Sequence, residues 1–475
     1  TYLAWKKDEV ISLQEYLTYL ISKGWIDITK LSLESQYSDS EEIYARLIDY
    51  IDENLIKDSY FNKRLYKYML LDDQITGAQV CMLLFEQNII DGTDEEKQAV
   101  QSGSKSAYNF MLEKIENLDI TPAQLALDPC SGSCVVTDTR TGEVLALVTY
   151  PGYDNNRLTN SIDSDYYNKI YYDLSQPMWN YATQQLSAPG STFKMVSAAT
   201  ALENNVVGLN ETITCKGTWD TLSPPARCWI APNGSHGPLD ISGAIEHSCN
   251  YFFYEVGYRL SRNNGVYDSD TGLEKLAYYA DQFGLSDKSG VEISESAPKV
   301  SDFDAIRSAI GQGTNNYSTV GLARYVTTVA NSGNCYNLSL LSKATDADGN
   351  LIADYTPTLR NTVDLKKSTW DAINQGMRKV VEDKDYYKDL TIQVAGKTGT
   401  AQENRKRANH ALFVCYAPYE QPQIAIATRI AFGYASDYAA QVTKDIVKYY
   451  FKLEDESSLI TGTAESTNVV QSAGD

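Results

Sequence analysis

Residues 188–194 read Ala188-Pro189-Gly190-Ser191-Thr192-Phe193-Lys194 and open an apolar run that continues to Leu202. The apolar side chains that follow Lys194 cover most of a helix circumference, which is typical of a buried helix. Ser191 and Lys194 are three residues apart and therefore share one face of the first turn. A desolvated amine in that place can take the proton of a serine hydroxyl, and a helix N-terminus stabilises arriving negative charge. The pair is a candidate nucleophile and base, although Ser-x-x-Lys alone is common by chance.

A second motif, Ser248-Cys249-Asn250, lies in a segment that otherwise looks helical from Asp240 to Leu260. Two small polar side chains separated by one residue project together only if the backbone turns between them. The alternative is a local side-chain cap with no role in chemistry.

A third motif, Gly396-Lys397-Thr398-Gly399-Thr400, closes a strand expected at Thr391–Ala395. Its glycines allow a ligand to approach the backbone closely and pair beside the strand. Lys397 and the hydroxyls of Thr398 and Thr400 can bind a carboxylate. The alternative is a solvated lysine in a turn at the end of a strand.

Ser-x-x-Lys, Ser-x-Asn and Lys-Thr-Gly in this order form the motif set of penicillin-binding proteins and serine β-lactamases. The flanking stretches 138–146, 310–313 and 394–402 strengthen the likeness. Over roughly residues 128–452 the chain resembles a class B penicillin-binding protein of the elongation type, from a Gram-positive-like bacterium.

The resemblance implies an α+β fold in which an antiparallel sheet is flanked by helices, preceded by a mostly helical region. We expect three parts: an interaction region at 1–127, a transpeptidase domain at 128–453 and a disordered acidic tail at 454–475. The residue pattern itself predicts a β-hairpin around Thr141-Gly142 and strands at Ala411–Tyr416 and Ile424–Ile430. It also predicts a helix from Asp437 to about Phe451, with Ala439, Val442, Ile446 and Val447 on one face.

The resemblance further implies a D,D-transpeptidase that forms an acyl-enzyme on D-Ala-D-Ala stem peptides and is acylated by β-lactams. Ser191 would attack, Lys194 would act as base, and Ser248 would relay the proton to the leaving amine. Asn250 would hold the substrate amide, and Lys397, Thr398, Gly399 and Thr400 would bind the terminal carboxylate. The backbone N–H groups of Ser191 and Thr400 would receive the oxyanion.

The string Cys215-x12-Cys228-x7-His236-x12-Cys249 offers three thiolates and an imidazole, a tetrahedral zinc set. Some class B relatives hold such a zinc, and here it would fix the second motif without taking part in the chemistry, which needs no cofactor. A Cys215–Cys228 disulfide is the alternative, with His236 on the surface; Asp220 and His247 are reserve ligands.

The remaining cysteines and histidine are less informative. Cys130 and Cys134 could be bridged or free. Cys81, Cys335 and Cys415 lie in apolar contexts typical of a core, and His410 beside the strand Ala411–Tyr416 is expected to be structural.

Composition limits the partners. The net charge of −21 argues against nucleic acid and anionic lipid. No run reaches the roughly 18 apolar residues of a spanning helix. Attachment to the extracytoplasmic face of the membrane, through an anchor upstream, is implied only by the resemblance. So are lipid-linked precursors, a separate glycan polymerase and shape-determining membrane proteins as partners.

Two related activities are disfavoured. A glycosyltransferase domain carries a histidine beside its acidic pair, and no histidine precedes His236. A class A β-lactamase needs a Glu-x-x-Leu-Asn loop between the second and third motifs, and the chain has none. A non-catalytic β-lactam sensor or assembly scaffold stays as the alternative function.

Overall fold

The computed structural model describes residues 1–31, 39–90, 92–117, 119–120, 123–125, 131–173, 175–221, 223–403 and 407–459. Cys130, for which a bridge to Cys134 and a free thiol were both left open, lies outside these residues, and Cys134 is a free, buried thiol. The chain divides into two compact units, Thr1–Ile120 and Thr121–Asp475. No helix among the described residues has the length and apolar character to cross a membrane.

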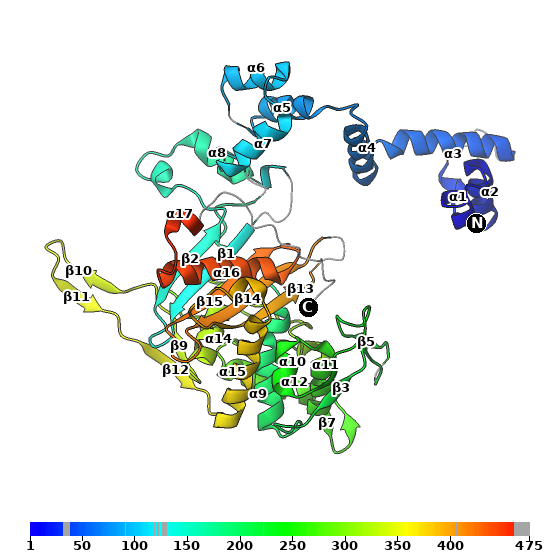
Figure 1. Cartoon of the computed structure of the whole chain (residues 1–475). Coiled ribbons are helices and arrows are strands. Elements are labelled where there is room, and N and C mark those ends of the chain that lie inside the picture. Colours follow the sequence, from blue (N-terminus) through cyan, green and yellow to red (C-terminus); the bar gives the residue numbers. More distant parts are fainter. Residues whose placement is uncertain are drawn as a thin grey trace. The chain divides into compact units, whose positions relative to one another are not determined.

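The first unit is helical, as Figure 1 shows in blue and light blue. Several of its helices begin with capping boxes. At the start of α3, for example, the Asp39 carboxylate accepts from the backbone N–H groups of Glu41 and Glu42. Its elements are α1 (Tyr2–Lys6), α2 (Leu13–Ser22), η1 (Ile28–Lys30), α3 (Ser40–Leu55), α4 (Ser59–Leu71), α5 (Gly77–Glu86), α6 (Asp94–Ser102) and α7 (Ala107–Glu116).

The second unit is built around a five-stranded antiparallel sheet with the order β13-β14-β15-β1-β2. The predicted hairpin is β1 (Ser131–Asp138) and β2 (Val144–Tyr150), and the two predicted later strands are β14 (His410–Ala417) and β15 (Ile424–Ala431). β1 pairs with β15, so segments almost 300 residues apart share one sheet. The antiparallel sheet with helices around it confirms the predicted fold class.

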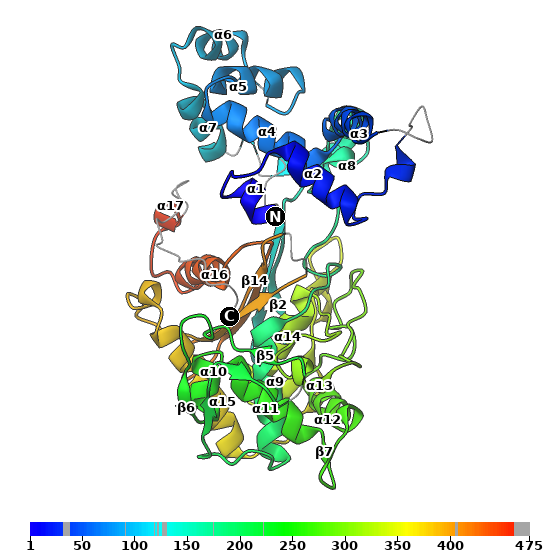
Figure 2. The same cartoon turned by 90° about the vertical axis from the view of Figure 1, so that its right-hand side faces the viewer.

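Helices cover both faces of the sheet (Figure 2), which explains why every residue of β14 and most of β15 are buried. Leu412 and Val414 pack in one core with α9 (Lys194–Glu203), α14 (Thr319–Ala330) and α15 (Lys367–Glu382). Phe413, on the opposite face, packs against α16 (Ser436–Tyr450).

The other helical elements of this unit are short or lie around these layers. They are η2 (Ala123–Leu125), η3 (Asn155–Leu158), α8 (Ser164–Tyr172), η4 (Gly190–Phe193), α10 (Ile241–Glu246), α11 (Asn250–Leu260), α12 (Ser269–Gln282), α13 (Ala305–Ser308), η5 (Asp385–Tyr387) and α17 (Glu456–Leu459).

Five small strand pairs, which the sequence pattern did not predict, complete the unit. They are β3 (Ile213–Cys215) with β6 (Gly237–Leu239), β4 (Thr218–Trp219) with β5 (Ala226–Arg227), β7 (Arg262–Asn263) with β8 (Val266–Tyr267), β9 (Asn334–Asn337) with β12 (Thr358–Thr362), and β10 (Lys343–Thr345) with β11 (Leu351–Asp354).

Three expectations were wrong in detail. The strand predicted at Thr391–Ala395 is instead β13, Ala395–Ala401, because the ladder to β14 pairs Ala395 with Tyr416 and continues through the motif. Val442 is 45% exposed and does not face the core as Ala439 and Val447 do. The tail expected to be disordered from 454 includes the helical turn α17, and its residues from 460 lie outside the described part.

Candidate active site

The Ser191 turn is a single 3-10 turn, η4, that runs directly into α9. Ser191 is 2% exposed and Lys194 is fully buried. Gly190 has φ +52°, and a Cβ there would lie 2.4 Å from the carbonyl oxygen of Thr400. Only glycine therefore lets this turn pack directly against β13.

Lys194 reaches the second motif. Its Nζ donates to the carbonyl oxygen of Ser248 at 2.7 Å, to Ser248 Oγ at 3.1 Å and to Asn250 Oδ1 at 2.7 Å. One amine thus joins the hydroxyl and the amide that the sequence singled out, one turn after Ser191. Proton exchange between Lys194 and Ser248 needs no movement of either segment.

The second motif lies in the predicted backbone turn. Helix α10 ends at Glu246, Ser248 has a left-handed φ of +49°, and α11 begins at Asn250. The Cys249 thiol caps α11 by accepting from the Phe252 N–H at 3.4 Å. A left-handed serine costs about 1–2 kcal/mol, and its bonds to Lys194 offset that strain. The cap expected as an alternative is present together with the Lys194 contact.

The third motif lies within β13, an edge strand of the described sheet, and not in a turn after it. Lys397 is fully buried, and its Nζ donates to the carbonyl oxygen of Thr398 at 3.1 Å. A Cβ on Gly399 would lie 2.7 Å from Thr192 Cγ2 and 2.9 Å from the Pro189 carbonyl oxygen. The structure therefore places the Ser191 turn directly on the Lys-Thr-Gly strand.

Two supporting residues escaped the sequence reasoning. Tyr325 of α14 donates its hydroxyl to the Thr192 carbonyl oxygen at 3.0 Å. Arg429, 2% exposed, donates from Nε to Ser187 Oγ at 3.1 Å. The sequence did carry a signal for Arg429. This arginine lies within the apolar run Ile424–Ile430, and a charge in a buried strand needs partners.

The predicted zinc ligands come together. One donor atom from each of Cys215, Cys228, His236 and Cys249 lies within 4.8 Å of the others. None of the three cysteines is in a disulfide, so the alternative bridge is wrong. Asp220 and His247 are not in this group; the His247 ring stacks on His236 with centroids 5.7 Å apart.

The donor set fits a thiophilic metal by its own chemistry. Hydrogen bonding from Cys249 lowers the pKa values of the Cys215 and Cys228 thiols, which favours thiolates. His236 Nε2 is buried and has no hydrogen-bond partner within the part of the chain that the structure describes, while Nδ1 lies 3.6 Å from Cys228 Sγ. Cys249 stands between Ser248 and Asn250, so an ion here would fix the second motif.

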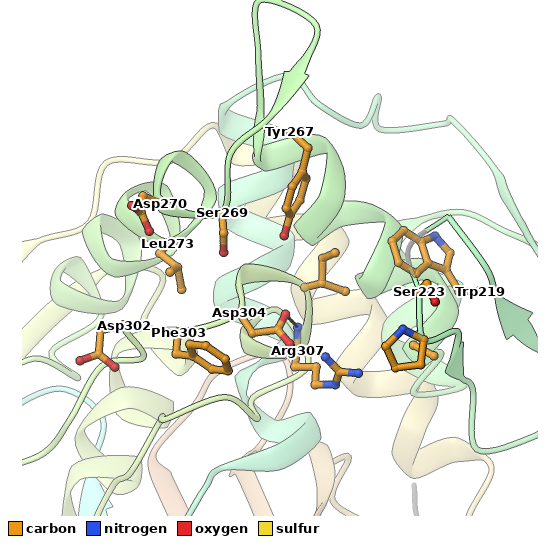
Figure 3. A pocket seen from close by; sticks show the side chains of 13 residues that line it. Trp219, Ser223, Tyr267, Ser269, Asp270, Leu273, Asp302, Phe303, Asp304 and Arg307 are labelled. Carbon is orange, nitrogen blue, oxygen red and sulfur yellow. Dashed lines mark hydrogen bonds and ion pairs between the residues drawn. The ribbon is translucent and has the colours of Figure 1, made fainter.

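A separate cavity of about 370 Å³ lies among β4, β5, the start of α12, and α13 (Figure 3). Trp219, Tyr267 and Phe303 contribute aromatic rings, and Arg307 forms an ion pair with Asp304 beside it. None of its 13 lining residues belongs to the three motifs.

The expected core residues are buried. Cys81, Cys335 and Cys415 are free and buried, and His410 is 1% exposed at the start of β14.

Known proteins resemble this chain in sequence and in fold. Peptidoglycan D,D-transpeptidase MrdA of Haemophilus influenzae is 30% identical over 362 residues, which cover 68% of this chain and 53% of the relative. The structure of PBP2 of Pseudomonas aeruginosa in complex with WCK 5153 matches with a TM-score of 0.58 and 25% identity, covering 73% of this chain and 78% of that one.

A complex between PBP2 and MreC from Helicobacter pylori shares the fold at 22% identity and a TM-score of 0.59, covering 73% of this chain and 63% of that one. The chain spans about half the length of the Haemophilus and Escherichia relatives that it matches. The family model described as "Penicillin binding protein transpeptidase domain" matches residues 132–448, two thirds of the chain. The chain therefore belongs to the penicillin-binding protein transpeptidase family.

Proposed function

We propose that this protein is a serine-type peptidoglycan D,D-transpeptidase without glycosyltransferase activity. The observation that carries the proposal is the three-fold coordination of Lys194 Nζ by Ser248 and Asn250, one helical turn after Ser191. Relatives with the same domain carry the name D,D-transpeptidase, which supports the assignment.

Ser191 Oγ attacks the carbonyl between the two terminal D-alanines of a stem peptide, and Lys194 takes its proton. The oxyanion is met by the backbone N–H groups of Ser191 and Thr400, each donor being worth roughly 10²–10³ in rate. The C–N bond breaks, and Ser248 delivers the proton to the departing D-alanine. An amine of a second stem peptide then attacks the acyl-enzyme and releases Ser191.

The third motif accounts for selectivity toward a C-terminal D-alanine. Lys397 and the hydroxyls of Thr398 and Thr400 provide one positive charge and two donors for its carboxylate. Gly399 keeps the strand close to the Ser191 turn. A β-lactam presents a comparable amide and carboxylate, so it acylates the same serine.

We further propose a structural zinc on Cys215, Cys228, His236 and Cys249. When bound, the ion supplies cross-links between the β3–β6 region and the Ser248 turn and does no chemistry. Metal analysis of protein purified without chelator is expected to give about one zinc per chain. A content below about 0.2 per chain would contradict this proposal.

An elongation role, a Gram-positive-like source, and a place at the extracytoplasmic face of the membrane are also proposals. The match to MrdA proteins supports the elongation role, while most of the matched relatives come from Gram-negative bacteria. The Helicobacter pylori complex with MreC supports shape-determining partners. Lipid-linked precursors and a glycan polymerase are the other partners that we propose.

Intact-mass analysis after incubation with benzylpenicillin tests the function directly. Wild type is expected to gain one adduct, Ser191→Ala none, and the exposed-serine control Ser342→Ala one. D-alanine release from a D-Ala-D-Ala peptide then separates an enzyme from a sensor. Labelling of wild type without any D-alanine release would reject the transpeptidase assignment.

A further inference from the structure

His410 is buried at the downstream end of the substrate strand. It is 1% exposed and is the first residue of β14, where it pairs with Ala401, the last residue of β13. Ala401 directly follows Thr400, whose N–H and hydroxyl belong to the proposed site. Across the ladder, His410 therefore pairs with the residue that follows Thr400, whose hydroxyl is proposed to bind the substrate carboxylate.

Both ring nitrogens of His410 are engaged. The backbone N–H of Phe432 donates to Nδ1 at 3.1 Å, and Nε2 lies 2.5 Å from Glu403 Oε2. Because a backbone N–H can only donate, Nδ1 must be unprotonated and the single ring proton is on Nε2. The neutral imidazole thus ties Glu403, which follows β13, to Phe432, which follows β15.

The charges around the ring keep it neutral. Burial lowers the pKa of His410, and Arg429 and Arg407 lower it further, while Glu403 opposes them. Arg429 projects from β15, and the Arg407 guanidinium lies 3.2 Å from the centre of the Phe432 ring. Protonation would add a proton at Nδ1, facing the Phe432 N–H, and would break that bond.

His410, Glu403, Arg407, Arg429 and Phe432 form one cluster. This cluster also contacts the segment that leads to Ser191. Arg429 donates from Nε to Ser187 Oγ at 3.1 Å, and Ser187 lies four residues before Ser191. The cluster thus spans the end of β13 on one side and the approach to the Ser191 turn on the other.

We propose that His410, through Glu403, is a positioning residue for acyl transfer that holds the Thr400 end of β13 in register with the Ser191 turn. The inference rests on the proposed transpeptidase function and deepens it. His410 touches no substrate atom in this arrangement. Its loss should weaken use of the substrate carboxylate more than the chemical step.

Four substitutions separate the two bonds of the ring. In H410N the amide oxygen replaces Nδ1 and still accepts from Phe432, but the bond to Glu403 is lost. In H410Q the amide nitrogen replaces Nε2 and still donates to Glu403. E403A removes the acceptor, and E403Q keeps it without the charge. The matched control is E420Q, an exposed glutamate in the connection between β14 and β15.

The readouts are KM and kcat for D-alanine release from a D-Ala-D-Ala peptide, with thermal unfolding of each variant. H410N and E403A are expected to raise KM about tenfold, the loss of one hydrogen bond to a charged group. H410Q and E403Q should restore KM to within about twofold of wild type, as should E420Q. Unchanged KM in H410N and E403A, or losses in every variant that follow unfolding alone, would overturn the proposal.

A pH profile adds a signature that a purely structural histidine would not give. The pKa of His410 in the folded protein lies below its ordinary value of 6.5, so the ring stays neutral at pH 6.5 and above. It gains a proton only as pH falls through the lowered pKa. KM of wild type should therefore rise on acidification, and KM of H410N should not follow it. If the wild-type protein neither binds penicillin nor releases D-alanine, the proposed function itself is wrong. If the wild-type protein is active but its KM depends on pH as that of H410N does, only this inference is wrong.

Discussion

Gly190 shows how one missing Cβ shapes the site. Its backbone is left-handed, and a Cβ would collide with the Thr400 carbonyl. Gly190→Ala is therefore expected to cost roughly 3–4 kcal/mol, strain and overlap together. Gly349→Ala, with φ +84° and nothing within 4 Å, isolates the strain and should cost only about 1–2 kcal/mol. Urea unfolding of both variants measures the difference, and equal costs would show that the turn does not press on β13.

Glu295 and Glu292 respond to pH in opposite directions. Burial raises the pKa of Glu295, so its contribution to stability is complete below about pH 4.5 and is lost as pH rises. Burial also acts on Glu292, but hydrogen bonds from Ser339 and the Leu340 N–H lower its pKa on balance. Its contribution is present above about pH 4.5 and is lost on acidification.

The corresponding glutamine variants test these signs. At neutral pH Glu295→Gln should unfold at higher urea than wild type, and Glu292→Gln at lower urea. Both differences should shrink toward zero near about pH 4. Urea midpoints measured at the two pH values check this, and shifts of the same sign at neutral pH would contradict it.

Helix α14 packs against β1, β14 and β15 on one side and contacts residues 284–288 on the other. All of its twelve residues are buried, including Arg324. The Arg324 guanidinium donates to the carbonyl oxygens of Gly284, Asp287 and Lys288 and to the Asp287 carboxylate. Gly284 is buried, whereas Asp287 and Lys288 are exposed, so the buried Arg324 side chain holds this surface turn against α14.

Arg324→Met is therefore expected to destabilise the second unit by about 2–3 kcal/mol, because the buried Gly284 carbonyl is left without its donor and the bonds to Asp287 and Lys288 are lost. The exposed Arg262, whose guanidinium donates to the Tyr258 hydroxyl, gives a matched control. Arg262→Met should change stability by less than about 0.5 kcal/mol. Calorimetric or urea unfolding measures both. Similar losses in the two variants would mean that Arg324 is not an anchor.

β13 illustrates what local pattern can and cannot reach. The apolar residues before Ala395 placed the predicted strand too early, with the motif at its end and a turn there as the alternative. The ladder to β14 decides otherwise, since Lys397 pairs with Val414 and Thr400 with Ala411. Two glycines made the segment look like a turn. In the fold, Gly396 lies against Phe413 and Gly399 lies against the Ser191 turn, and neither place has room for a Cβ.

For the whole molecule, the described active-site residues and their hydrogen-bond partners all lie in Thr121–Asp475. A fragment of residues 121–475 is therefore expected to fold and to be acylated by penicillin at a rate within about twofold of the full chain. Fluorescent-penicillin labelling over time makes the comparison. A fragment that unfolds cooperatively like the full chain but labels more than tenfold slower would show that residues 1–120 contribute to the site.

The three motifs, the four candidate metal ligands, the β1–β2 hairpin, β14, β15 and α16 could be predicted from the sequence, because each depends on side-chain chemistry or on local periodicity. It could not give the boundary of β13, the five small strand pairs, or the roles of His410 and Arg429. Those depend on contacts between segments up to almost 300 residues apart, and nothing in a local window encodes which distant carbonyl or N–H will face a given side chain. The contact between the Ser191 turn and β13 became visible in the fold alone, since it depends on Gly190 and Gly399 meeting at a place where neither has room for a Cβ.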